Sequence, residues 1–130
     1  MQTLTTTVAR ILFSIPFLAF GAMHLMNADA MAAMVPVPGG AFWIYFTGIC
    51  LLAGGLALAT GILGKWAALG IAALLLLFVV TMHIPALSHP EMRQMAVGNL
   101  LKDVGLAGAA LTWAGLFARK DEPVRQAVRA

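Results

Sequence analysis

Long runs of apolar residues alternate with short polar connections along this chain. Two of the runs, 41–63 and 66–84, contain no Asp, Glu, Lys or Arg. An α-helix rises about 1.5 Å per residue, so each run is long enough to cross a hydrocarbon core of about 30 Å. We predict that both runs are membrane-spanning helices, and that residues 36–40 (PVPGG) form an extended return into the second helix.

The first apolar run, 11–26, is shorter. Val8 and Ala9 extend it beyond Arg10, whose long side chain can reach the membrane interface. A cleaved signal peptide is the alternative, because Arg10, the apolar run and the small residues at 28–30 resemble the three-part signal pattern. The region before the run carries little charge, which favours an uncleaved spanning helix.

A fourth helix is predicted to begin at the outer surface and to contain two charges. Ser88 and Glu91 have the spacing of a capping box, so we expect this helix to start near His89. It continues past Lys102 and Asp103 and is long enough to cross the membrane with some tilt. The predicted helices are 8–26, 41–60, 66–84 and 89–118.

The sequence therefore predicts an all-α fold, an integral membrane four-helix bundle with up-down-up-down topology over 1–118, followed by a basic tail at 119–130. Basic residues gather at one side of this topology: Arg10, Lys65, Arg119, Lys120, Arg125 and Arg129. The positive-inside rule then places both termini in the cytoplasm.

Small residues predict the surfaces through which helices pack. In lipid there is no hydrophobic driving force between helices, and small side chains let their backbones come close enough for van der Waals packing. The candidate stripes are Ala53, Ala57 and Gly61 on the second helix, and Gly105 with Ala109 or Ala110 with Ala114 on the fourth.

Composition agrees with a membrane protein and excludes several classes. Of the 130 residues, 62% are hydrophobic and 10% charged, against roughly 45–50% and 25% in ordinary soluble domains. The net charge of +3 comes mainly from the tail and one turn, as is typical of contact with anionic lipid, so we expect no nucleic-acid partner. Cys50 is the single cysteine, which excludes an intramolecular disulfide and CxxC chemistry.

Five polar residues form the candidate site. Asn99, Lys102 and Asp103 share a broad face of the fourth helix, and a charge inside a bilayer marks a functional site by default. His24 and His83 end the first and third helices at the same predicted membrane side. We expect the five to line one pocket beneath the outer connections.

Three interpretations of this group stay open. In the structural one, Lys102 and Asp103 compensate each other and the histidines only end their helices. In the second, histidine, lysine and asparagine donors bind the oxygens of a quinone headgroup. In the third, a soft metal binds thioethers and imidazoles of the outer connections, namely Met23, His24, Met26, Met31, Met34, Met82 and His83. Their spacing is irregular and methionine commonly fills gaps, so we predict no metal site.

The segment Phe20-Gly21-Ala22-Met23-His24 resembles the F-G-x-x-H/K segment that ends the first helix of DoxX-family membrane proteins. The second helix, with Gly54 and Gly55, is similar to that family's second helix with its paired glycines, and the third and fourth helices follow in family order. Many relatives carry an acidic residue shortly before the paired glycines, where this chain has Cys50 and Leu51.

This resemblance implies a small four-helix inner-membrane protein. Some relatives serve as subunits of quinone-reducing sulfur oxidoreductases or of terminal oxidases, or are linked to thiol and oxidative stress. The resulting hypothesis is an accessory or quinone-interacting subunit of a membrane oxidoreductase system, in which His24 and Lys102 bind the headgroup and Asp103 holds the lysine or relays a proton. The alternative is a non-catalytic structural module that binds a partner helix or a second copy. The sequence leaves open whether the chain is an enzyme.

Overall fold

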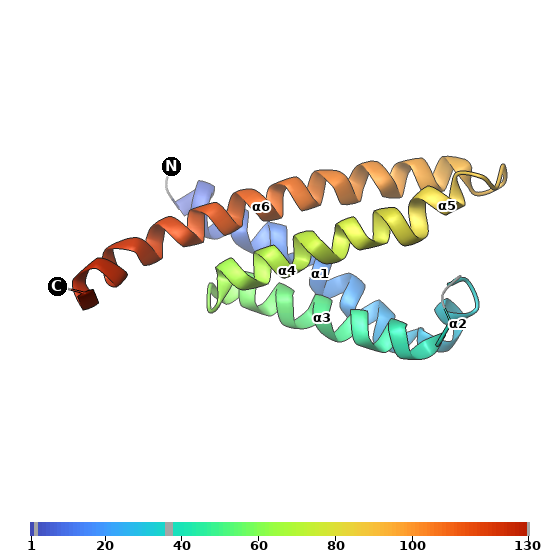
Figure 1. Ribbon diagram of the computed structural model, residues 1–130, viewed down its shortest axis with the longest axis horizontal. Helices are drawn as coiled ribbons and strands as arrows, with labels where there is room; N and C mark the ends of the chain where they lie inside the picture. Colours follow the sequence, from blue (N-terminus) through green and yellow to red (C-terminus); the bar gives the residue numbers. More distant parts are fainter. Residues whose placement is uncertain (2, 36–37, 130) are drawn as a thin grey trace. The chain divides into compact units, whose positions relative to one another are not determined.

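A computed structural model describes residues 1, 3–35 and 38–129, with side chains described up to residue 120. Every element in the described residues is helical. The chain divides into two compact units, Met1–Ile62 and Leu63–Ala130. Each unit contains one pair of long helices (Figure 1).

The first unit begins with a π-helical turn, η1 (Leu4–Val8), which leads into α1 (Ala9–Met26). A short helix, α2 (Ala28–Ala32), precedes α3 (Ala41–Thr60), which packs along α1 (Figure 1). Of the predicted extended return at 36–40, Pro36 and Val37 lie outside the described residues. Gly39 and Gly40 both have positive φ, and Trp43 donates a hydrogen bond from Nε1 to Pro38 O (2.8 Å).

Glycines in α1 and α3 allow the backbones of the two helices to lie close together. A Cβ added to Gly21 of α1 would lie 2.9 Å from Gly48 O and 2.7 Å from Leu52 Cγ of α3. Gly55 lies against Leu18 in the same way. Within this unit the buried face of α3 therefore follows these glycines. Ala53 of the predicted small-residue stripe is exposed in the unit, and the stripe at 53, 57 and 61 stays a prediction.

The second unit contains α4 (Gly64–Phe78), a π-helical turn η2 (Val79–His83), the short α5 (Ile84–Ala86) and α6 (Arg93–Arg129). The predicted capping box is wrong. The Ser88 hydroxyl donates to Pro85 O (2.7 Å) and so closes the preceding turn, and α6 begins only at Arg93. The helix also runs well beyond residue 118, the predicted end.

Alanines form the face that α6 turns to α4. Its buried residues begin with Ala96 and, seven residues later, continue at intervals of four and three: Asp103, Ala107, Ala110, Ala114 and Phe117. This confirms the predicted pair Ala110 and Ala114, and it leaves Gly105 exposed. At the start of α4, Gly64 lies against the Phe117 ring, and a Cβ added to this glycine would come within 2.5 Å of the ring's Cζ.

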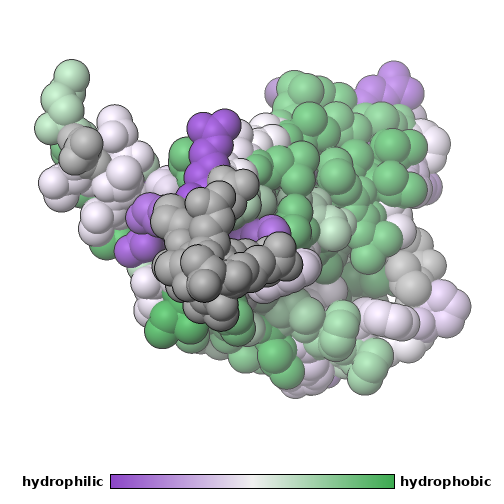
Figure 2. Space-filling model, turned by 60° about the vertical axis from the view of Figure 1, so that its left-hand side comes forward, coloured by the Kyte–Doolittle hydropathy of each residue, from purple (hydrophilic) through white to green (hydrophobic). Residues whose placement is uncertain are grey.

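Four helical stretches of the described residues are long and apolar enough to cross a membrane: Leu4–Met26, Ala41–Thr60, Gly64–Ala86 and Arg93–Lys120. Large apolar side chains lie exposed along them, among them Ile49, Leu77 and Leu101. The space-filling view accordingly shows hydrophobic side chains over most of the visible surface whose side chains are placed (Figure 2). Such a surface is stable in lipid and not in water, which confirms the predicted four-span membrane architecture.

Candidate functional site

A carboxylate lies in the alanine stripe that packs α6 against α4. Asp103 is only 3% exposed, and it occupies the position of the stripe one turn before Ala107. It lies ten residues after Arg93, where α6 begins, which corresponds to about 15 Å along the helix. Asp103 lies within the stretch Arg93–Lys120, which is long and apolar enough to cross a membrane, so its carboxylate needs polar partners there.

His83 supplies the first partner. Its Nε2 lies 2.9 Å from Asp103 Oδ2, and the carboxylate can only accept, so Nε2 carries the proton. The ring is mostly buried, at 18% side-chain exposure. Its second nitrogen, Nδ1, makes no hydrogen bond within the described residues. In the neutral ring Nδ1 is an acceptor with a fixed orientation, as in other histidine–carboxylate pairs.

Lys102 supplies the second partner. Its Nζ lies 3.4 Å from Asp103 Oδ1, so each carboxylate oxygen has one cationic or hydrogen-bonding neighbour. The lysine side chain is 40% exposed, and its long stem reaches back over the helix to its sequence neighbour. With a neutral His83 the three side chains carry no net charge, which lowers the cost of holding them in lipid.

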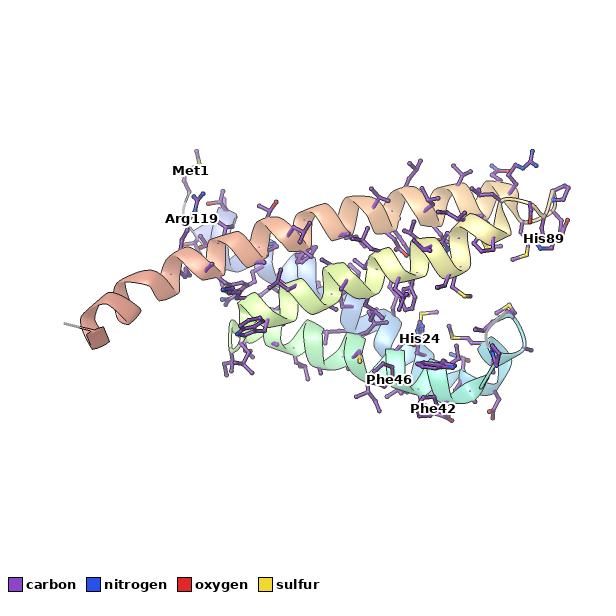
Figure 3. All side chains as sticks on the ribbon, viewed as in Figure 1. Met1, His24, Phe42, Phe46, His89 and Arg119 are labelled. Atoms are coloured by element: carbon purple, nitrogen blue, oxygen red, sulfur yellow. The ribbon has the colours of Figure 1, made fainter. Side chains whose placement is uncertain are left out.

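The other two predicted site residues lie outside this group of three. Asn99 is half-buried on α6, four residues before Asp103, and its amide makes no hydrogen bond within the described residues. His24 belongs to the first unit, where its Nδ1 donates to Phe20 O (2.7 Å) near the end of α1. Figure 3 shows it beside the part of α3 that carries Phe46. The prediction that all five residues line one pocket stays a prediction.

The pairing of His83 with Asp103 is the contact that the sequence analysis missed, since it assigned Asp103 to Lys102 alone. A signal was present in the spacing. Asp103 continues the three-and-four interval of Ala107, Ala110 and Ala114, which places it on the helix face turned toward α4. Among the described residues there is no group of three or more His, Cys, Asp or Glu side chains that could hold a metal.

The group formed by His83, Lys102 and Asp103, here called the α6 polar cluster, can bind a small molecule that carries oxygen. His83 Nδ1 can accept a hydrogen bond from a hydroxyl, and Asp103 would stabilise the ring once it took up the proton. The Lys102 ammonium can donate to a carbonyl or phenolate oxygen.

The four spans and the charged residues inside them define a small multi-pass membrane protein. The DoxX family model matches residues 5–84, which is more than half of the chain. This chain belongs to the DoxX family, as the resemblance predicted. The match includes the first apolar helix, His24 and His83, and it ends before Asn99, Lys102 and Asp103. Neither the curated proteins nor the solved structures contain a significant match to the chain.

Proposed function

We propose that this protein is a quinone-interacting subunit of a membrane oxidoreductase system, and that the α6 polar cluster binds the ligand's headgroup. The observation that supports this is a buried carboxylate inside a membrane-spanning helix, held between a histidine and a lysine. Ionisable side chains in lipid are expensive and usually serve transport or proton exchange. Quinones dissolve in the bilayer and exchange protons at their ring oxygens during redox change.

In this proposal His83 and Lys102 contact the ligand, and Asp103 orients both. Hydrogen-bonded to Asp103 through Nε2, His83 offers Nδ1 to a hydroxyl hydrogen and can take its proton. Lys102 donates to a ring oxygen, and Asn99 adds a further amide donor one turn along α6. The quinone would supply the two-electron chemistry, and the protein supplies binding and a proton acceptor.

The proposal also places the protein in a bacterial-type plasma membrane, with both termini on the cytoplasmic side. Arg10 and Lys65 support it, because each lies near the end of a span at the side that this orientation makes cytoplasmic. In a Cys50→Ala background, we expect Asn27→Cys and Ser88→Cys to react with a membrane-impermeant maleimide added to intact cells. Lys120→Cys should react only after permeabilisation. Labelling of positions 27 and 88 from opposite sides would contradict the topology.

Binding of a short-chain benzoquinol tests the site directly. In nanodiscs, we expect His83→Gln to weaken the affinity of the quinol about tenfold, the effect of losing one well-formed hydrogen bond in a dry site. Lys102→Met should weaken the affinity for the oxidised benzoquinone by a similar factor, because the ammonium donates a hydrogen bond to a carbonyl oxygen. Both affinities can be measured by fluorescence or calorimetric titration.

The chain offers matched controls for both substitutions. His89 lies in the connection between α5 and α6, exposed and 3.7 Å from Glu91 (Figure 3), so His89→Gln should leave the quinol affinity unchanged. Lys120 is exposed at the far end of the last span, and Lys120→Met should likewise have no effect. Equal affinities for His83→Gln, Lys102→Met and the unmodified protein would reject the site.

A structural role is the second candidate function, and one observation favours it. On α6, no described atom of the second unit lies within 4 Å of the position that a Cβ would take at Gly98, Gly105, Gly108 or Gly115. Small residues of this kind let another helix approach closely in lipid. Crosslinking in native membranes distinguishes the two functions: a stoichiometric protein partner without any quinol binding would favour the structural role.

A further inference from the structure

The third span carries a proline, Pro85, two residues after His83. The buried residues Ile71, Leu75 and Val79 define the face of this span that packs against α6. Four residues exceed one α-helical turn by about 40°, since a turn takes 3.6 residues. In continuous α-helix, the two steps from Leu75 to Val79 to His83 would therefore rotate His83 about 80° away from Leu75.

The observed helix avoids this rotation because it is π-helical over Val79–His83. The Ile84 N–H donates to Val79 O, five residues back, where an α-helix would bond four residues back. A π-helical turn takes more residues than an α-helical one, so a step of four residues falls short of a turn and cancels the drift. His83 is thereby returned to the packed face, where it meets Asp103.

Pro85 accounts for the change of helix type at this place. In an α-helix, the ring of Pro85 would clash with the carbonyl of Thr81, and its missing N–H would leave that carbonyl without its bond. Widening the preceding turn relieves the clash. Pro85 itself then lies in the first turn of α5, a position where the missing N–H costs little. The Thr81 hydroxyl, which donates to Leu77 O (2.7 Å), further loosens the helix.

We infer that Pro85 is the positioning residue of the α6 polar cluster: it holds the third span in π-helical register so that His83, and not Met82, faces Asp103. This inference rests on the proposed function for its significance. The register itself is a property of the folded chain and is measurable without any ligand. Met82 follows Val79 by three residues. If the helix were α-helical throughout, this spacing would place Met82, instead of His83, on the packed face.

Cysteine crosslinking tests the register. In the Cys50→Ala background, His83→Cys and Met82→Cys are each combined with Asp103→Cys and treated with a short bifunctional thiol reagent in membranes. With Pro85 present, we expect the 83–103 pair to crosslink at least several times faster than the 82–103 pair. With Pro85→Ala the preference should reverse. Pro90→Ala, a proline change in the exposed connection before α6, should leave it unchanged.

Each other result overturns the inference. Crosslinking that stays at position 83 in Pro85→Ala shows that the register does not depend on the proline. Loss of both crosslinks assigns Pro85 to folding of the helix pair and not to orientation of His83. Neither result concerns quinol binding, so the inference can fail while the proposed function stands.

A rescue experiment connects the register to binding. Pro85→Ala should weaken benzoquinol affinity about tenfold, as His83→Gln does. In the same background, exchange of the neighbours by Met82→His with His83→Met should restore the affinity, because the histidine again occupies the packed face. A purely structural defect would not be repaired by this exchange, so failure of the rescue would overturn the positioning role. If the unmodified protein binds no quinol, the proposed function fails and the crosslinks still decide the register.

Discussion

Asp103→Leu is expected to lower the free energy of unfolding by about 1–3 kcal/mol, because it leaves the buried His83 Nε2–H without its acceptor. Leucine branches at Cγ as aspartate does but has no hydrogen-bond acceptor, so the change removes the acceptor of the pair. Lys102 adds little to this cost, since its side chain is 40% exposed and can reach the headgroups. Denaturant titration of the protein in mixed micelles, followed by circular dichroism, measures the effect.

A double-mutant cycle isolates the pair. His83→Leu combined with Asp103→Leu removes both partners and should cost less than the sum of the single changes, because no buried donor stays unpaired. Asp29→Leu, at an exposed carboxylate of α2, serves as the control and should change stability by less than about 0.5 kcal/mol. Additive effects of the two single changes would show that His83 and Asp103 do not interact.

Gly21→Ala is expected to separate α1 from α3 and to cost about 1–3 kcal/mol of stability. The added methyl group would lie 2.9 Å from two backbone atoms of α3, Gly48 O and Leu52 N. Backbone atoms cannot rotate away as a side chain can, so the helices must move apart and lose contacts along their whole length. The same unfolding titration measures this loss.

Gly105→Ala is the matched control, since it makes the same chemical change in α6 with no described atom within 4 Å of the new Cβ. Alanine favours helix over glycine by up to about 1 kcal/mol, so this variant should be as stable as the unmodified protein or slightly more stable. If both glycine variants lost the same stability, the close contact at Gly21 would not be what holds α1 against α3.

The sequence was sufficient to predict the four spans, because apolar runs of membrane length leave few alternatives. Prediction from the sequence failed where a local sequence pattern pointed to one structure and the contacts in the folded chain produced another. Ser88 and Glu91 satisfied a capping pattern, yet Pro85 O took the serine hydroxyl and closed a turn before α6. The face of α3 that packs against α1 was not predicted, because small residues on several sides of a helix look equivalent until Gly21 and Gly48 are seen to meet.

The polar cluster was predicted only in part, for a reason that lies in helix geometry. Lys102 and Asp103 are recognisable in the sequence as charges within an apolar helix, and they lie in contact, as one interpretation expected. The role of His83 depends on a π-helical turn, and simple periodicity assumes a constant 3.6 residues per turn. Pro85 was the available clue, but a proline near the end of a span normally indicates only where the helix stops.

The depth of Asp103 gives the cluster an electrical property. A charge that reaches the cluster from either aqueous side moves part of the way through the low-dielectric slab, because Asp103 lies about 15 Å along α6 from Arg93, within a helix of membrane-spanning length. A full crossing is worth about 2.3 kcal/mol per elementary charge for each 100 mV, so a charge brought to this depth gains or loses a fraction of that energy. Any reaction that carries a charge into the cluster is therefore coupled to the voltage across the membrane.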